Sequence, residues 1–412
     1  MRADESCTAE ADGLRYVVIP LSIQQDGDVY VVGTVDLGEF YQFPEQGLAI
    51  LKMLQSGDTP AEISARLTDE ASDPVDVDDF VDQLTDIGFI YREDPGQAVA
   101  VRPETAAPIA NRTFNVDPRL ARALFSLPVV ACCSTIVLYA ILVATANPAL
   151  RLNIDALYTD TNRTLLLVTV LGLSLIQTVA HELGHMLAAA RHGIKCRYGI
   201  GTRMWTIVAE SDLTGILSLP RAKRYFPMLA GLLVDILSLS LLTILLDALL
   251  RFGVGGFTVQ VVQVMMLEIA IAMAWQFNVF VKTDIYFVIC NYFSYPDLDL
   301  DARAYLRHLL HRVTFARFGE LAPSRVFDNL AILRVFSLVW AFGRVLSLIV
   351  LFAVFLPTMW RYVESAIGML NGPPASVWVA CDTIIYVSIL LTMLGAGMYM
   401  WLKPQWQNRG AQ

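Results

Sequence analysis

The stretch TLLLVTVLGLSLIQTVAHELGHMLAAA, residues 164–190, begins with seventeen residues that carry no charge and ends with two histidines and a glutamate. A helix of roughly 20 apolar residues is long enough to cross the hydrocarbon core of a bilayer. On such a helix, residues four apart share one face, so the imidazoles of His181 and His185 can reach the same metal ion. Glu182 lies beside them, where a carboxylate can take a proton from a water. The stretch therefore predicts a metal site at membrane depth.

The composition of the whole chain agrees with a membrane protein. Of its 412 residues 55% are hydrophobic and 17% charged, and the mean hydropathy is +0.52. Soluble domains carry about 25% charged residues. Residues 1 to about 118 have the composition of a soluble domain, whereas long apolar runs dominate after residue 124. We expect a mostly α-helical, polytopic membrane protein with a small N-terminal domain.

The charge distribution argues against a nucleic-acid partner. The formal net charge is −9, and residues 69–94 hold ten acidic side chains and one arginine. No basic stripe of the kind that binds phosphates is present in the sequence. Residues 1–13 are polar and acidic and lack the apolar core of a signal peptide, so we expect the N-terminal domain to stay in the cytosol. The six cysteines form no CxxC pair, and we expect neither disulfides nor a cysteine zinc site.

Six runs are long and apolar enough to span a bilayer as helices. They cover residues 124–146, 164–190, 227–250, 254–281, 331–356 and 377–402. With the N-terminus in the cytosol, the inside loops hold eighteen lysines and arginines and the outside loops hold four. Positive residues gather on the cytosolic side of membrane proteins. The sequence therefore predicts that both termini are cytosolic and that His181 and His185 lie near the cytosolic side.

A catalytic zinc usually takes three protein ligands, so one more is needed. The remaining histidines are His192, a possible ligand two helical turns after His185, and His308 and His311, which we expect to be solvated. Asp284 is the stronger candidate, because it follows the fourth run on the cytosolic side, level with His185. Buried charge in lipid is costly and tends to be functional. The acidic residues that rival Asp284 on this ground are Asp235, Asp247, Glu268 and Asp382.

His181-Glu-Leu-Gly-His185, an Ala230-Gly231 helix start and the segment from Asn278 to Asp284 together resemble the site-2 protease family of intramembrane zinc metalloproteases. The bacterial peptide zinc metalloprotease branch is more similar still, with a third-ligand segment that typically reads Asn-Pro-Phe-Leu-Lys-x-Asp-Gly-Tyr. Here the segment reads Asn278-Val-Phe-Val-Lys-Thr-Asp284-Ile-Tyr286. The likeness covers roughly residues 124–356. The chain departs from the pattern at Val279, which replaces a proline, and at Ile285, which replaces a glycine.

The resemblance implies a multi-pass protein of the bacterial inner (plasma) membrane that binds Zn²⁺ through His181, His185 and Asp284. It implies that Glu182 is the general base of peptide hydrolysis and that Asn278 helps to hold the substrate backbone. The substrate would be a peptide or a transmembrane protein, cleaved near the cytosolic leaflet. Two alternatives stay open. One is a proteolytically silent metal-binding membrane partner for export or maturation of a modified peptide, which the two departures favour. The other is a zinc transporter, which the single ligand cluster disfavours.

The N-terminal region predicts a small α+β domain. Residues 15–20 and 29–33 are rich in β-forming residues, and Gln25-Asp26-Gly27-Asp28 between them is typical of a hairpin turn. Helices are expected over residues 44–55, from Thr59-Pro60 onward, and over 76–87. This order is winged-helix-like and resembles PqqD-like domains, which bind precursor peptides by strand addition. A regulatory or purely structural domain is the alternative.

The expected domain organisation follows from these patterns. Residues 1–96 form the cytosolic domain, residues 97–118 form a linker, and residues 119–412 form a six-helix membrane domain. The linker is assigned from its content of alanine, proline and valine. The predicted metal site lies entirely within the third of these segments.

Overall fold

The computed structural model describes residues 16–34, 39–70, 76–92, 112–114, 116–157, 162–203, 206–313, 329–350, 352–353, 356–371 and 377–409. The chain divides into two compact units. Unit 1 comprises Met1–Asn115 with Ile194–Arg197 and Asp212–Arg224, and unit 2 comprises Val116–Gly193, Tyr198–Ser211 and Tyr225–Gln412. Most of the expected linker, residues 97–111, lies outside the described residues.

Unit 1 contains two small antiparallel sheets. One has the order β2 (Ser22–Asp26), β3 (Val29–Thr34) and β4 (Glu39–Phe43), and the other pairs β1 (Tyr16–Val18) with β5 (Ile90–Arg92). The predicted turn is confirmed between β2 and β3, where Asp26 pairs with Val29 and Gly27 adopts φ +69°. The expectation that residues 15–20 form the first strand of this hairpin is wrong, because β1 pairs with β5. The glutamines of β2 have little β propensity, which concealed this strand.

Three helices complete the N-terminal part of unit 1. They are α1 (Glu45–Ser56), α2 (Pro60–Glu70) and α3 (Val77–Asp86), close to the predicted positions. Thr59 and Glu62 form a reciprocal capping box at the start of α2, with the Thr59 N–H donating to Glu62 Oε2 at 2.8 Å. The side chain of Asp76 accepts a hydrogen bond from the Asp79 N–H at the start of α3. These helices and the strands enclose one apolar core.

Unit 1 also includes Ile194–Arg197 and Asp212–Arg224. The strands β6 (Arg112–Phe114), β7 (Cys196–Arg203) and β8 (Thr206–Asp212) form a three-stranded sheet in that order, and most residues of β7 and β8 belong to unit 2. The 3₁₀ helix η3 (Thr214–Ser218) packs against β3. Beyond it, Arg224 Nη1 donates to Asp26 Oδ2 at 2.9 Å, and Arg221 also pairs with Asp26. No strand was predicted over residues 196–212.

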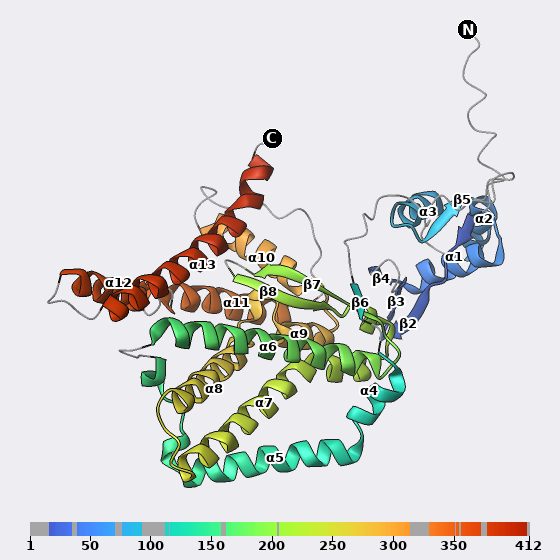
Figure 1. Ribbon diagram of the computed structural model, residues 1–412. Helices are drawn as coiled ribbons and strands as arrows, with labels where there is room; N and C mark the ends of the chain where they lie inside the picture. Colours follow the sequence, from blue (N-terminus) through green and yellow to red (C-terminus); the bar gives the residue numbers. More distant parts are fainter. Residues whose placement is uncertain are drawn as a thin grey trace. The chain divides into compact units, whose positions relative to one another are not determined.

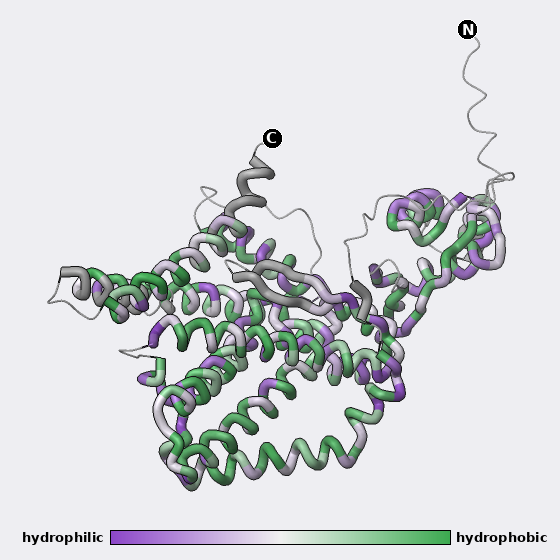
Figure 2. The backbone as a smooth tube through the Cα atoms, in the orientation of Figure 1, coloured by the Kyte–Doolittle hydropathy of each residue, from purple (hydrophilic) through white to green (hydrophobic). Residues whose placement is uncertain are grey.

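Among the described residues, six helical segments are long and apolar enough to cross a membrane. They are Pro118–Ala146, which contains α4 (Pro118–Leu124) and α5 (Leu127–Ala146), then α6 (Arg163–Ala190), α7 (Arg221–Arg251), α8 (Phe257–Trp275), α11 (Leu330–Val350) and α13 (Val377–Arg409). Figure 1 shows these helices, and Figure 2 shows α5, α7 and α8 as apolar along most of their length. The predicted fold class, a mostly helical polytopic membrane protein with a small strand-containing N-terminal domain, is confirmed.

Several helix boundaries differ from those predicted, mainly between α8 and Asp284. The fourth run, predicted over 254–281, is helical only over Phe257–Trp275, and a 3₁₀ turn η4 (Val279–Val281) follows. Lys282 has φ +57°, which ends this turn and lets α9 (Asp284–Phe293) and then α10 (Leu298–Val313) begin. The Ala230-Gly231 pair does not start a helix, because α7 begins at Arg221. An additional helix, α12 (Leu356–Asn371), precedes α13.

Candidate metal centre

The site is built where α6 and α7 approach each other closely. A Cβ atom on Gly184 of α6 would lie 2.7 Å from Val234 Cγ2 and 3.0 Å from the Ala230 carbonyl oxygen. A Cβ atom on Gly231 of α7 would lie 2.3 Å from His185 Nε2 and 2.5 Å from His181 Nε2. Small residues let membrane helices pack backbone to backbone. The two glycines therefore bring both imidazoles directly against α7.

Three side chains converge at this contact. The Nε2 atoms of His181 and His185 are 3.2 Å apart, and each lies 3.2 Å from Asp284 Oδ2. These are the atoms, one from each residue, that could hold one metal ion. A tetrahedral zinc with bonds of about 2.0–2.1 Å has ligand atoms about 3.3 Å apart. The spacing of the three atoms fits this geometry and leaves a fourth position for water or substrate.

The partners of the two Nδ1 atoms support a metal site between the Nε2 atoms and Asp284. His185 Nδ1 lies 2.7 Å from the carbonyl oxygen of Pro227. A carbonyl can only accept, so Nδ1 carries the proton and the Nε2 of the neutral ring presents a lone pair. His181 Nδ1 lies 2.9 Å from Asp235 Oδ2, a second acceptor. In these tautomers two nitrogen lone pairs and a carboxylate oxygen face one another, and a divalent cation satisfies all three.

The turn after α8 places Asp284. The Asp284 N–H donates to the side-chain oxygen of Gln276 at 3.1 Å, and Thr283 Oγ1 donates to the Gln276 carbonyl at 2.6 Å. These two hydrogen bonds hold the backbone at Asp284, and its Oδ2 atom lies against both Nε2 atoms.

The two departures from the family pattern do not displace Asp284. Val279 is buried in an apolar cluster that includes Tyr286, Leu298 and Leu333, and Ile285 packs against the same cluster. Phe280 beside Val279 stacks edge-on against Trp340 of α11. The side chains of Val279 and Ile285 thus anchor the segment that carries Asp284.

Glu182 is held by a serine of β8. The carboxylate oxygen Oε2 of Glu182 accepts hydrogen bonds from the Ser211 N–H at 2.9 Å and from the Ser211 hydroxyl at 2.6 Å. Ser211 lies near the end of β8, a strand that the sequence did not reveal. Two donors on one oxygen fix the orientation of a carboxylate, and they leave its second oxygen, Oε1, to act as a base.

The remaining sequence candidates are not among the three ligand residues. Asn278 precedes η4 and donates its backbone N–H to the Trp275 carbonyl, and no hydrogen bond within the described residues joins its side chain to the three ligand residues. His192 follows α6, and His308 and His311 lie on α10. Within the described part of the chain, none of these histidines belongs to the group that could hold a metal.

The four rival acids have different partners. Asp235 contacts the site, but through the far nitrogen of His181 and not as part of the ligand group. Glu268 on α8 accepts a hydrogen bond from Ser174 Oγ at 2.5 Å, and Asp247 pairs with Arg251 one turn later on α7. Asp382 on α13 accepts the N–H groups of Arg163 and Thr164 and so caps the start of α6. Apart from Asp235, these carboxylates hold helices together or pair along one helix.

None of the five described cysteines belongs to the group that could hold a metal. Burial and the nearby charge of Asp212 raise the pKa of Cys196 to about 12, and burial raises the pKa of Cys290 to about 11. Both thiols therefore stay protonated at neutral pH and behave as small apolar side chains. The five described cysteines are all free thiols.

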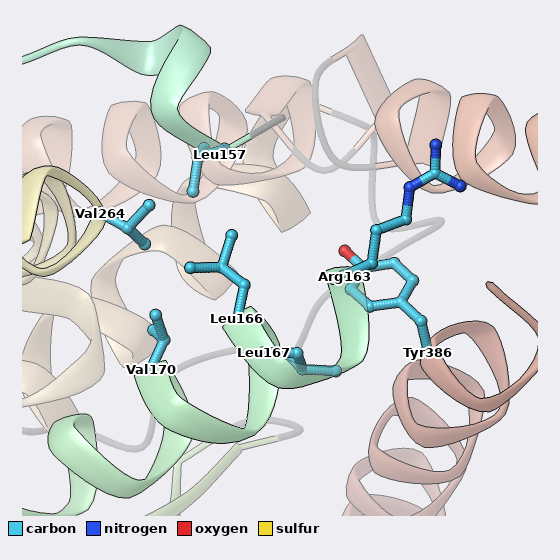
Figure 3. Close-up of a pocket in the computed structure, with 7 residues that line it drawn as sticks. All are labelled: Leu157, Arg163, Leu166, Leu167, Val170, Val264 and Tyr386. Carbon is cyan, nitrogen blue, oxygen red and sulfur yellow. The ribbon is translucent and has the colours of Figure 1, made fainter. Parts of the chain in front are cut away.

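A small cavity lies far from the histidines. It has a volume of about 100 Å³ and is lined by seven residues, namely Leu157, Arg163, Leu166, Leu167, Val170, Val264 and Tyr386 (Figure 3). Arg163 starts α6, and the eighteen residues from there to His181 span about 27 Å of helix. The cavity therefore belongs to the opposite end of α6 and not to the candidate centre.

Several contacts of the site were absent from the sequence reasoning. These are the Pro227 carbonyl, Gln177, Ser211 and the close approach of Gly231. Asp235 was noticed for its charge within an apolar run, but as a rival ligand. Gly231 was a second signal in the sequence. It lies in an otherwise apolar helix, and close helix packing favours small residues.

No family model matches this chain, and no curated protein or solved structure shows significant similarity to it.

Proposed function

We propose that the protein is a zinc metalloendopeptidase that hydrolyses peptide bonds at membrane depth. One observation carries the proposal: the Nε2 atoms of His181 and His185 and the Oδ2 atom of Asp284 lie 3.2 Å from one another in a chain with six apolar helices. Two imidazoles and a carboxylate are a ligand set typical of catalytic zinc. The same set without an adjacent base would support only metal storage, but here Glu182 neighbours His181 in the sequence.

The chain's own residues divide the work. A bound zinc ion supplies Lewis acidity toward the scissile carbonyl and the attacking water. Glu182, oriented by Ser211 through Oε2, takes the proton of that water on Oε1 and delivers it to the leaving amine. The side chains of His181 and Asp284 keep 13% and 18% of their surface exposed, whereas that of His185 keeps 2%. Water and substrate therefore reach the site from the side of His181 and Asp284.

The position of the site suggests the kind of substrate. His181 and His185 fall in the last third of α6, and the loops that would face the cytosol hold eighteen basic residues against four on the other side. We propose a site near the cytosolic leaflet of a bacterial plasma membrane, with both termini in the cytosol. The substrate is then a peptide or a transmembrane protein whose helix unwinds locally, because the carbonyls of an intact helix are hydrogen-bonded.

The N-terminal domain has an edge that a peptide can join. β4 is an outer strand of its three-stranded sheet, and an outer strand can pair with an extended peptide. We propose that this domain recruits the substrate peptide by strand addition. A tethered precursor peptide would then reach the membrane site at high local concentration.

The test compares the wild-type chain with Glu182→Gln in cells. Profiling of protein N-termini should reveal new termini next to apolar segments only with the wild type, because glutamine cannot take up the proton. The purified Glu182→Gln protein should retain its zinc, since Glu182 is not a ligand. Glu268→Gln, which alters another carboxylate within a candidate span, serves as the matched control and should keep the cleavage. Zinc binding without any wild-type-specific termini would instead favour the proteolytically silent partner.

A further inference from the structure

Asp235 is a buried carboxylate on an apolar helix, and it has two polar partners on α6. Its side chain is buried, and Oδ2 lies 2.9 Å from His181 Nδ1. Its other oxygen, Oδ1, accepts a hydrogen bond from Gln177 Nε2 at 2.9 Å. Gln177 and His181 are four residues apart and so share one face of α6. Both oxygens of Asp235 are therefore directed at one face of the helix that carries the ligands.

The geometry excludes Asp235 from the ligand group itself. Nδ1 and Nε2 lie on different sides of the imidazole ring, and Nε2 is the atom that faces His185 and Asp284. Asp235 reaches only Nδ1. The ring of His181 thus stands between this carboxylate and the position where the three ligand atoms converge.

The two imidazoles are supported in different ways. His185 Nδ1 has a neutral partner, the Pro227 carbonyl, whereas His181 Nδ1 has a carboxylate. Pro227, Gly231 and Asp235 are spaced four residues apart, so one face of α7 supplies the carbonyl, the gap that accommodates both rings, and the carboxylate. A carboxylate behind a metal-ligating histidine fixes the tautomer and ring orientation and strengthens electron donation by the ligating nitrogen.

We propose that Asp235 is a positioning residue for the metal centre, which acts through His181, and that Gln177 holds Asp235 in place. Asp235 fixes the proton on Nδ1 of His181, directs Nε2 at the metal and places a second negative charge near a dication. The inference rests on the proposed metal site of His181, His185 and Asp284. It also assigns a function to the buried carboxylate of Asp235, which is not one of the three ligands.

A purely structural contact between α6 and α7 is the competing explanation. The chain offers a matched comparison, because Glu268 of α8 makes the same kind of contact with Ser174 of α6. Ser174 precedes His181 by seven residues, or about two helical turns, and Glu268 is not a member of the ligand group. A variant at Glu268 therefore reports what the loss of a carboxylate within the helix bundle does without contact to a ligand.

The experiment uses the full chain, purified in detergent, in the variants Asp235→Asn and Glu268→Gln. Zinc affinity is measured by competition with a chelator, and the visible spectrum is recorded after cobalt substitution. We expect Asp235→Asn to bind one zinc per chain at saturation but with an affinity about 10- to 100-fold lower, and to change the cobalt bands. Glu268→Gln should match the wild type in both. Equal affinity and an unchanged spectrum in Asp235→Asn would overturn the inference.

Gln177→Met keeps the test decisive if Asp235→Asn does not give a monodisperse protein. Methionine has a similar length but no amide, so Asp235 loses one anchor while its charge remains. We expect a loss of zinc affinity of a few-fold, in the same direction as for Asp235→Asn, and an unchanged affinity would count against the positioning role. His185→Ala separates the two hypotheses: zinc retained there would refute the metal site, whereas zinc lost there but unaffected by Asp235→Asn and Gln177→Met would refute only the function of Asp235.

Discussion

The two units distribute their polar and apolar side chains in opposite ways. In unit 1, Leu51, Ile63 and Phe89 are completely buried. In unit 2, Leu138 and Leu142 of α5 are 68% and 65% exposed, while His185 and Asp235 are 2% and 4% exposed. The first pattern is that of a domain folded in water, and the second is that of helices surrounded by lipid.

This difference shows where chemistry can be placed. Burial of apolar surface from water stabilises unit 1, and its buried charges Asp26 and Arg224 are paired with each other. In lipid, the burial of leucines does not stabilise contacts between helices, because the lipid tails are equally apolar. Close packing and hydrogen bonds hold such helices together. The close approach of Gly184 to Ala230, that of Gly231 to the two histidines, and the hydrogen bond between His181 and Asp235 are of this kind. The interior of unit 2 can therefore hold the metal ligands and contribute to helix association at once.

The largest effect is expected where the two helices of the centre meet. Gly231→Ala adds a methyl group within 2.3 Å of His185 Nε2 and 2.5 Å of His181 Nε2, which displaces both ligand atoms. We expect zinc binding to fall by at least 100-fold, because a metal site tolerates errors of only a few tenths of an ångström. Gly172→Ala is the control on α6, since its added Cβ meets nothing within 4 Å. Zinc affinity measured by chelator competition checks both, and equal affinities would contradict the packing described for α6 and α7.

A matched pair of leucines sharpens the contrast between the units. Leu51→Ala opens a cavity in the buried core of unit 1 and should lower the free energy of unfolding of that domain by about 2–5 kcal/mol. Leu142→Ala removes the same atoms from an exposed position on α5 and should change stability by less than about 0.5 kcal/mol. Hydrogen exchange in increasing denaturant measures the stability of α1 and of α5 separately. A comparable loss at both positions would show that the two units do not differ as described.

The smallest effect concerns a helix start in unit 1. Thr59→Ala removes the hydroxyl that caps α2, while Glu62 keeps its bond to the backbone N–H of residue 59. We expect a loss of about 1 kcal/mol in the stability of unit 1 and no change in zinc content. Denaturant unfolding and metal analysis of the same sample check this. A loss of zinc would show that the centre depends on the N-terminal domain, against the division into units.

The elements that the sequence predicted well are those with a strong local signal. The six apolar runs are long, and a membrane span depends on little else than length and composition. The capping box at Thr59 and Glu62 and the turn at Gly27 are likewise local and were found. In contrast, β1 was assigned to the wrong partner, because strand pairing depends on contacts between Tyr16–Val18 and Ile90–Arg92, far apart in the chain.

The candidate site also contains residues that the sequence predicted and contacts that it did not predict. His181, Glu182 and His185 could be selected from spacing alone, and Asp284 from its level in the membrane and the resemblance of its segment. The partners of these residues could not be predicted, because they depend on the rotation of α7 against α6. That rotation directs Asp235 at His181 Nδ1 and the Pro227 carbonyl at His185 Nδ1. The contact of Ser211 with Glu182 had no signal at all, since β8 was not recognised as a strand.

The most direct test of the central claim is the zinc content of the full chain after chromatography in detergent. We expect about one zinc per wild-type chain and almost none in His185→Ala or Asp284→Ala, with Glu268→Gln equal to the wild type. Asp284 is the decisive position, because it joins the two histidines from a separate helix at 3.2 Å. A wild-type chain that binds no zinc at saturation, or an Asp284→Ala variant that keeps its full complement, would refute a zinc site of His181, His185 and Asp284.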